Sequence, residues 1–273
     1  MDKKRVLFIS QEISPFLPSS NIASIARKLP QGIQEGGKEI RAFMPRFGCI
    51  NERRHQLHEV IRLSGMNLII DDVDHPLIIK VASVPQAKIQ VYFIDNEDFF
   101  KRKATVNDNE GNFFQDNDER AMFFSRGVLE TVKKLGWKPD IIHCHGWMTA
   151  LAPLYIKKLY KDDPHFEDTK LVYSVYDTDF NKNWDSKFYE KLKFDGFNEE
   201  DINGLQDVDF VALNKMAINV CDGVIQGSES INEDLSKEIE KSGTPFLEYY
   251  PEESCVKPVD EFYDQIIEEL VEN

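Results

Sequence analysis

Short apolar runs alternate with stretches of helical periodicity in the first part of the chain. Residues 6–9 are continuously apolar and bounded by polar residues, which is typical of a strand covered on both faces. Apolar side chains then recur at the spacing of one helix face, at Ile22, Ile25, Ala26 and Leu29. We therefore expect a helix over residues 21–34, followed by a second strand at 39–45. This alternation predicts an α/β domain with a mostly parallel sheet covered by helices.

The later part of the chain continues this alternation after a segment of different character. Residues 57–95 contain successive extended runs separated by turn residues, which indicates a strand-rich insertion or the edge of the sheet. Further strands are expected at residues 139–145, 169–177 and 221–228, and helices at 116–136, 147–160 and 229–243. Residues 103–117 and 181–207 show no such pattern, and we expect them to be flexible.

The last residues carry an amphipathic pattern. Apolar side chains follow one another at helical spacing, at Phe262, Ile266, Ile267 and Leu270. We expect a helix over residues 258–271 that docks on the core, because a single helix is too short to begin a new domain. The chain is thus expected to form one domain over residues 1–273.

The composition restricts the kinds of partner. The chain has 273 residues, 41% of them hydrophobic, and a formal net charge of -15. Phosphate contacts need clustered lysines and arginines, so neither a nucleic acid nor an anionic membrane is expected as a main partner. A neutral ligand such as a sugar chain meets no such objection.

Cysteine usage and hydropathy favour a cytoplasmic protein. The four cysteines are widely spaced and form no C-x-x-C pair, as expected for reduced thiols. After its charged start the chain reaches Gln11 within a few apolar residues, and no later run approaches the roughly 18 residues that span a bilayer. We expect neither export nor membrane anchoring.

Two groups of polar residues invite a chemical interpretation. The sequence His-Cys-His at residues 143–145 places both imidazoles on one face of a strand, where they could ligate a metal or form hydrogen bonds at a buried strand end. Two ligands without a nearby carboxylate are too few, so we expect no metal. Asp177 and Asp179 follow a strand, where aspartates more often cap turns than act in catalysis. No cofactor is expected either.

The segment from Gly136 to Lys158 resembles the starch synthases and bacterial glycogen synthases. Three further stretches match in the same order: residues 6–16, which include Glu12, and residues 36–48 and 116–130. The resemblance implies a family of retaining glucosyltransferases that use ADP-glucose and have the GT-B fold, in which two Rossmann-like domains face each other across a cleft. It covers residues 3–235 and implies a three-layer Rossmann-like domain, the N-terminal half of that fold.

The first turn departs from the family pattern. The family has Lys-Thr-Gly-Gly-Leu here, whose lysine and bare glycine amides approach the donor and its phosphates. This chain has Pro18, Ser19, Ser20, Asn21 and Ile22 at the matching positions. The cation is gone, side chains stand where the backbone must come close, and proline has no amide to donate. We expect the family's donor contact to be lost, although Ser19, Ser20 and Asn21 also suit the capping of the following helix.

Two further family motifs are altered. The family's His-Asp-Trp-His reads His145, Gly146, Trp147, Met148, and its Thr-Ile-His-Asn reads Ser174, Val175, Tyr176, Asp177. By resemblance, the candidate substrate-binding residues are Glu12, Ser19, Ser20, Asn21, His145, Trp147, Tyr176 and Asp177, and no residue is assigned a catalytic role. Trp147 and Tyr176 could stack on a sugar ring; alternatively, Trp147 anchors the next helix and Tyr176 fills space left by a lost partner domain.

Three functions remain open from the sequence. The family's C-terminal domain supplies most of the nucleotide pocket, and we expect it to be absent because only about 45 residues follow residue 228. The first hypothesis is an inactive module that binds an α-glucan or a protein partner. The second is a component that transfers glucose from ADP-glucose to a glucan with a second domain supplied by another chain. The third is a structural homodimer joined through the face left by the missing domain.

Overall fold

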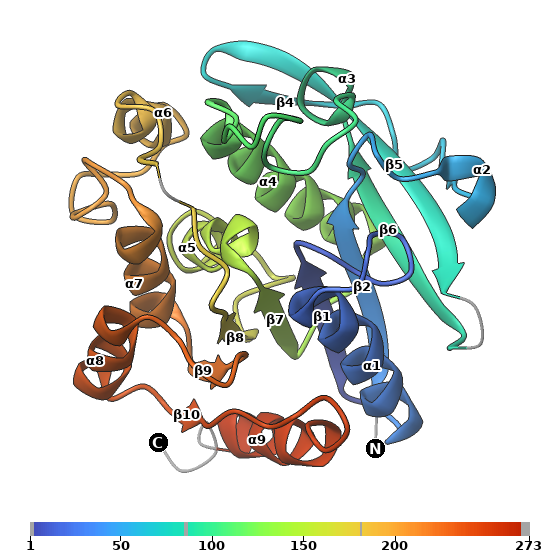
Figure 1. Ribbon diagram of the computed structural model, residues 1–273, viewed down its shortest axis with the longest axis vertical. Coiled ribbons are helices and arrows are strands. Elements are labelled where there is room, and N and C mark those ends of the chain that lie inside the picture. Colours follow the sequence, from blue (N-terminus) through green and yellow to red (C-terminus); the bar gives the residue numbers. More distant parts are fainter. Residues whose placement is uncertain (1–2, 85–86, 181, 269–273) are drawn as a thin grey trace.

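The computed structural model describes residues 3–84, 87–180 and 182–268, and one large sheet runs through it (Figure 1). In chain order the strands are β1 (Arg5–Ser10), β2 (Glu39–Pro45), β3 (His58–Glu59), β4 (Met66–Ile70), β5 (Val73–Val84), β6 (Ile89–Asp95), β7 (Ile141–His145), β8 (Lys170–Val175), β9 (Gly223–Gln226) and β10 (Phe246–Leu247). Their order across the sheet is β10-β9-β8-β7-β1-β2-β6-β5-β3, with β4 paired to β5.

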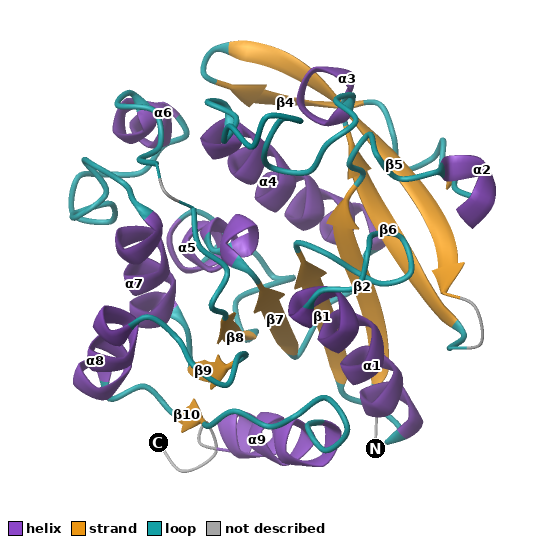
Figure 2. Cartoon of the chain, viewed as in Figure 1, coloured by secondary structure: helices purple, strands orange, loops and turns teal. Residues whose placement is uncertain are grey.

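The centre of the sheet is parallel and one edge is antiparallel (Figure 2). β1 pairs in parallel with β2 and β7, and the parallel pairing continues through β8, β9 and β10. The strand-rich stretch at residues 57–95 forms the antiparallel edge, where β5 pairs with β3, β4 and β6. A turn at residues 61–63 separates β3 from β4, so the first extended run forms two strands. The expected mostly parallel α/β fold is confirmed.

Helices cover both faces of this sheet. They are α1 (Asn21–Glu35), α2 (Glu52–His55), α3 (Glu97–Phe100), α4 (Asn117–Leu135), α5 (Leu151–Lys158), α6 (Phe188–Phe194), α7 (Phe210–Val220), α8 (Glu233–Ser242) and α9 (Val256–Glu268), with a 3-10 turn, η1 (Trp147–Thr149), before α5. The chain adds β2 on one side of β1 and β7 to β9 on the other. Because crossovers between parallel strands are right-handed, α1 and α5 lie on opposite faces. No helix in the described part of the chain is both long and apolar enough to cross a membrane.

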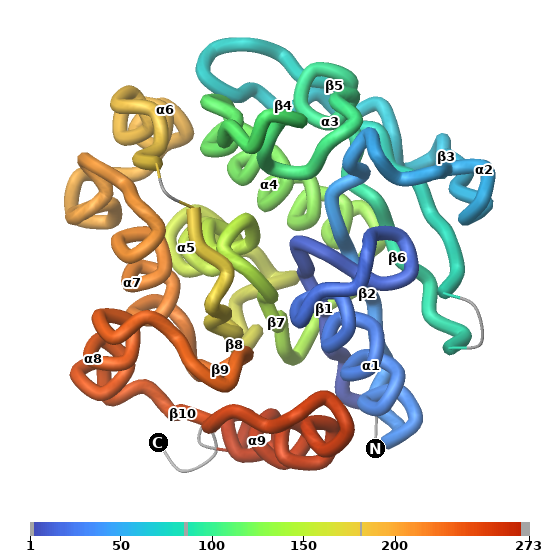
Figure 3. The backbone as a smooth tube through the Cα atoms, viewed as in Figure 1, coloured from blue at the N-terminus to red at the C-terminus, as the bar shows by residue number. Residues whose placement is uncertain are grey.

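The C-terminal helix α9 packs beside α1 (Figure 3). Its buried side chains are Val259, Phe262, Tyr263 and Ile266. Gly32 in α1 permits the close approach, because a Cβ atom there would lie 2.5 Å from Val256 Cγ1. Lys38 Nζ lies 2.7 Å from Asp260 Oδ1, and this ion pair stabilises the packing of α9.

Two details differ from the sequence expectation. Residues 181–207 contain α6, which is held by the buried Lys191, whose Nζ donates to Asp118 Oδ2 at 2.8 Å. α7 has no counterpart among the expected helices; it begins after Asp209, whose carboxylate accepts a hydrogen bond from the Ala212 amide. Residues 269–271 of the expected C-terminal helix lie outside the described residues.

Candidate functional site

The candidate residues gather where the strand order reverses. The chain passes from β1 to β2 on one side and later adds β7 on the other side of β1. Ligands of open α/β sheets bind beyond the carboxyl ends of the strands at such a switch point. Four chain segments meet there, carrying Glu12 after β1, His145 in β7, Tyr176 and Asp177 after β8, and Ser228 after β9.

The side-chain oxygen of Ser20 caps the N-terminus of α1. Its Oγ accepts a hydrogen bond from the Ala23 amide at 3.0 Å and donates one to Glu12 Oε2 at 2.5 Å. A carboxylate thus stands near the helix N-terminus, where the helix dipole favours negative charge. Ser19 is exposed, and its Oγ lies 3.1 Å from that of Ser24. The helix-capping interpretation is confirmed for Ser20.

Asn21 ties the first turn to the other side of the sheet. Its Nδ2 donates to Gly227 O at 2.9 Å and to Ser228 Oγ at 3.0 Å. Ser228 Oγ in turn donates to Asp177 Oδ1 at 2.9 Å. These four residues, which we call the clasp, join the start of α1 to the ends of β8 and β9. The clasp uses the polar groups of Asn21 and Asp177 within the protein.

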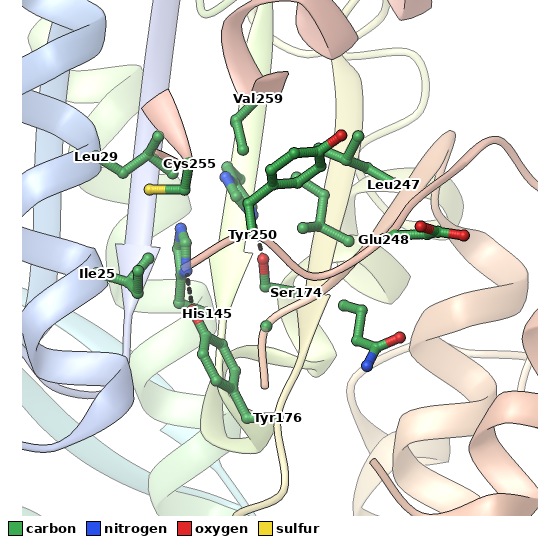
Figure 4. A pocket seen from close by; sticks show the side chains of 14 residues that line it. Ile25, Leu29, His145, Ser174, Tyr176, Leu247, Glu248, Tyr250, Cys255 and Val259 are labelled. Carbon is green, nitrogen blue, oxygen red and sulfur yellow. Dashed lines mark hydrogen bonds between the residues drawn. The ribbon is translucent and has the colours of Figure 1, made fainter. Parts of the chain in front are cut away.

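Two neighbouring histidines form a second hydrogen-bonded group. His143 and His145 have ring centroids 3.8 Å apart. The two ring nitrogens of His143 lie 2.6 Å from the Tyr263 hydroxyl and 2.7 Å from Ser174 Oγ. His145 Nδ1 lies 2.8 Å from the Tyr176 hydroxyl, as Figure 4 shows. The group links β7 and β8 to α9.

Burial keeps both imidazoles uncharged. Desolvation lowers the pKa of His143 well below its ordinary value, and the neighbouring His145 adds to the effect. Desolvation alone lowers the pKa of His145 to about 3. Among the residues that the structure describes, no three His, Cys, Asp or Glu side chains converge on a point that could hold a metal ion. This group can therefore exchange hydrogen bonds, but it offers no positive charge to a phosphate near pH 7.

The two aromatic candidates are buried. Trp147 is 3% exposed and packs among Phe113, Phe180 and Trp184, with ring centroids 4.9 to 6.2 Å away. Tyr176 is 2% exposed, and a Cβ on Gly227 would lie 2.7 Å from its ring. These contacts accord with the alternative in which Trp147 anchors the helix that follows it.

The structure separates the candidates into four places. Glu12, Ser20, Asn21 and Asp177 meet in or beside the clasp; His145 and Tyr176 lie with the histidine pair; Trp147 belongs to the aromatic cluster, and Ser19 lies at the surface. Sequence reasoning did not single out Ser228, which joins Asn21 across 207 positions. In the sequence, Ser228 can be recognised as a small polar residue just after a strand.

The fold and these strand ends define the class of the protein: an α/β domain of the kind that forms half of a GT-B glycosyltransferase. The chain matches the starch synthase catalytic domain family over residues 5–245. It therefore belongs to that family.

Relatives and a solved structure agree with this assignment. The chain is 43% identical to a glycogen synthase of Chlorobium limicola over 63% of this chain and 35% of the relative. It is 38% identical to that of Chlorobaculum parvum over 73% and 42%. The catalytic domain of starch synthase IV from Arabidopsis thaliana, bound to ADP and acarbose, superposes with a TM-score of 0.75 at 19% identity, covering 90% of this chain and 51% of that one. The chain thus spans less than half the length of these two glycogen synthases.

Proposed function

We propose that this chain is a glucan-binding module of the starch synthase family that does not transfer glucose by itself. The observation that carries the proposal is the clasp. The turn that meets the donor in the family is closed here by its own side chains. Any donor bound in the family's manner would have to break the hydrogen bonds of Asn21 to Gly227 and Ser228.

Charge at the first turn supports the loss of donor binding. The position of the family's lysine is held by Pro18, which offers neither a cation nor an amide. Ser20 Oγ already accepts the Ala23 amide, and the Glu12 carboxylate is hydrogen-bonded beside it. A phosphate brought to this end of α1 would meet that negative charge in a partly buried place, where repulsion is poorly screened.

A groove at the surface supports the binding of a sugar chain. Phe113, Phe114 and Trp184 line it together with Gln115 and Asn183, and its volume is about 710 Å³ including its open side. Phe113 and Phe114 are half-buried, so part of each ring is free to stack. Aromatic faces beside amide groups match the alternating apolar and hydroxyl surfaces of a sugar ring. The structural neighbour with acarbose bears a sugar-like ligand, as expected of this family.

Calorimetric titration with maltooligosaccharide and, separately, with ADP-glucose tests the proposal. We expect saturable heat with the oligosaccharide and none with ADP-glucose. Phe113→Ala should weaken oligosaccharide binding by about fivefold or more, because stacked rings contribute about 1 kcal/mol or more each. Phe194→Ala is the matched control, since Phe194 is an exposed phenylalanine on α6 outside the groove.

Three outcomes would contradict the proposal. Saturable heat with ADP-glucose would restore the donor site, and glucosyl transfer on mixing with a second chain would favour the shared-enzyme hypothesis. A dimer in solution that buries the groove and leaves no oligosaccharide binding would favour the structural homodimer.

A further inference from the structure

The groove that we propose for a sugar chain has two walls from different parts of the chain. The first wall, just before α4, consists of Phe113, Phe114 and Gln115. The second wall, just before α6, consists of Lys182, Asn183, Trp184 and Asp185. Each wall continues into a helix, so contacts between α4 and α6 affect the distance between the walls.

One buried lysine of α6 connects the two walls. Lys191 is 2% exposed, and its Nζ donates hydrogen bonds to three carboxylates. Two of these, Asp118 at 2.8 Å and Glu119 at 2.6 Å, lie in the first turn of α4, directly after the first wall. The third, Asp185 at 3.2 Å, belongs to the second wall. The ammonium group of Lys191 thus bridges the walls without lining the groove itself.

The charges around Lys191 show what the bridge prevents. The carboxylates of Asp118, Glu119 and Asp185 surround its ammonium group and would repel one another if that group were removed. Asp118 is fully buried, where such repulsion is poorly screened. Loss of the cation would therefore move Asp185, and the second wall with it, away from the start of α4.

Other hydrogen bonds hold each wall to its own surroundings. The Phe114 amide of the first wall donates to Val106 O at 3.1 Å, and the Trp184 amide of the second wall donates to Val208 O at 2.8 Å. Among the hydrogen bonds of the described residues, those of Lys191 join the first turn of α4 to the second wall. The bridge therefore acts on the separation of the walls rather than on either wall alone.

We propose that Lys191 is a positioning residue of the groove, whose three hydrogen bonds hold the second wall at the distance from the first at which both contact one sugar chain. The inference rests on the proposed function, because the groove is a sugar site only under that proposal. It extends that function by assigning the fit between walls and sugar to a buried cation outside the groove.

Asp185→Asn separates the bridge from the local turn. Asp185 Oδ1 accepts the Lys187 amide at 3.0 Å, and asparagine keeps that acceptor; Oδ2, which accepts from Lys191, becomes an amide nitrogen that cannot accept. In calorimetry at pH 7.5, maltooligosaccharide should bind about threefold more weakly or worse, because a displaced wall loses part of its stacking contact. Glu199→Gln is the matched control, since this exposed carboxylate pairs with Lys193 of α6.

A double-mutant cycle distinguishes positioning from direct contact of Asp185 with the sugar. If Asp185 acts through Lys191, Asp185→Asn should cause little further loss of affinity in a Lys191→Met background. An undiminished effect in that background would mean that Asp185 binds the sugar directly, and would overturn the positioning role. Circular dichroism shows whether each variant is folded.

Fluorine nuclear magnetic resonance of the chain labelled with 5-fluorotryptophan tests the bridge even if Lys191→Met does not fold. Without any sugar, Glu119→Met should shift the Trp184 resonance, because it removes the shortest hydrogen bond of Lys191. Glu119 neither lines the groove nor neighbours Trp184 in the sequence. A loss of stability alone does not move a resonance of the folded state. An unmoved Trp184 resonance in Glu119→Met, or an equal shift in Glu199→Gln, would overturn the proposal.

Failure of this inference and failure of the proposed function give different results. If the natural chain shows no saturable heat with maltooligosaccharide, the proposed function fails. If the natural chain binds the sugar, and Asp185→Asn and Glu119→Met bind it equally well, the groove remains the sugar site and Lys191 does not position its walls.

Discussion

At the scale of single residues, the first turn is held together by hydrogen bonds of its own side chains. Ser20 gives its oxygen to the helix N-terminus and its proton to Glu12, while Asn21 reaches Gly227 and Ser228. Glycines at these positions could do neither, because they have no side chain. These side chains therefore stabilise the turn by contacts within the protein.

Neighbouring serines provide a test of this stabilisation. Ser20→Ala should lower the free energy of unfolding by about 1 to 2 kcal/mol, because the N-cap and the Glu12 hydrogen bond are lost together. Ser19→Ala should change it by less than about 0.5 kcal/mol, since Ser19 is exposed. Urea unfolding at pH 7 measures both. Equal losses in the two variants would mean that the cap contributes nothing specific.

The buried His145 makes stability depend on pH. Its pKa is lowered to about 3 in the folded chain, against about 6.5 when unfolded, so between these values the unfolded chain binds a proton that the folded chain does not. Stability is therefore lost as the pH falls below 6.5. Over pH 6.5 to 5 this histidine should remove about 1.5 kcal/mol from the free energy of unfolding.

Comparison with His145→Phe isolates that contribution. Desolvation keeps the buried His143 neutral in both proteins, so the loss of free energy of unfolding between pH 6.5 and 5 should be about 1.5 kcal/mol smaller in the variant. Parallel pH profiles for the two proteins would mean that the imidazole of His145 is not held neutral in the folded chain.

The candidate site was only partly predictable at this scale. Residue type alone indicated that Ser20 caps a helix, because serine oxygens suit that position. The partner of Asn21 is Ser228, 207 positions later, and no local pattern carries that distance. The burial of Trp147 depends on Phe180 and Trp184, which lie in a stretch without periodicity. Contacts between residues far apart in the sequence determine the partner of Asn21 and the burial of Trp147.

At the scale of elements, strands and amphipathic helices followed from periodicity, whereas α6 and α7 did not. The strand β1 and the helix α1 have clear patterns, and they form where expected. α6 has only seven residues, too few to show a period, and its position depends on an ion pair with α4. Tertiary contacts, not helix propensity, determine such short elements.

The buried Lys191 is that ion pair's cation. It is 2% exposed and its Nζ donates to Asp118 at 2.8 Å and to Glu119 at 2.6 Å. Burial lowers the pKa of Lys191, but its hydrogen bonds to Asp118 and Glu119 raise it above the ordinary value. Burial also raises the pKa of Asp118 to about 6, despite the bond from Lys191.

Lys191→Met should therefore cost about 3 to 5 kcal/mol at pH 7, because it leaves the Asp118 carboxylate buried and unpaired. The loss should be smaller at pH 5, because Asp118 is then protonated in both proteins and no buried charge is left unpaired. Lys193→Met on the same helix is the control, and its exposed pair with Glu199 predicts a change below about 1 kcal/mol. Urea unfolding at both pH values distinguishes these cases. A loss at pH 7 no larger than that of Lys193→Met would contradict the buried pair.

At the scale of the whole molecule, α9, late in the chain, packs against α1, which lies early in it. The helix lies beside α1, and the hydroxyl of its Tyr263 is hydrogen-bonded to His143. It therefore forms part of the core. Its residues lie beyond the family match, which ends at residue 245. Gly32 of α1 faces Val256 of α9, and substitutions at these two positions can test the contact.

Gly32→Ala tests this docking because two effects oppose each other. In a free helix the change would stabilise by about 1 kcal/mol through helix propensity. Here the new Cβ would lie 2.5 Å from Val256 Cγ1, and overpacking against a stiff β-branched side chain costs about 1 to 3 kcal/mol. We therefore expect Gly32→Ala to be destabilising in the natural chain and much less destabilising in a Val256→Ala background, where the Cβ of residue 256, 3.1 Å away, is the nearest atom left.

The double-mutant cycle of these two positions measures the coupling in urea unfolding. A coupling energy of about 1 kcal/mol or more would mean that α9 is docked on α1 in solution, since residues that do not touch contribute additively. If Gly32→Ala stabilised both backgrounds equally, the helix would not be docked there. The bond between Tyr263 and His143 would then be absent as well, because Tyr263 belongs to the same helix.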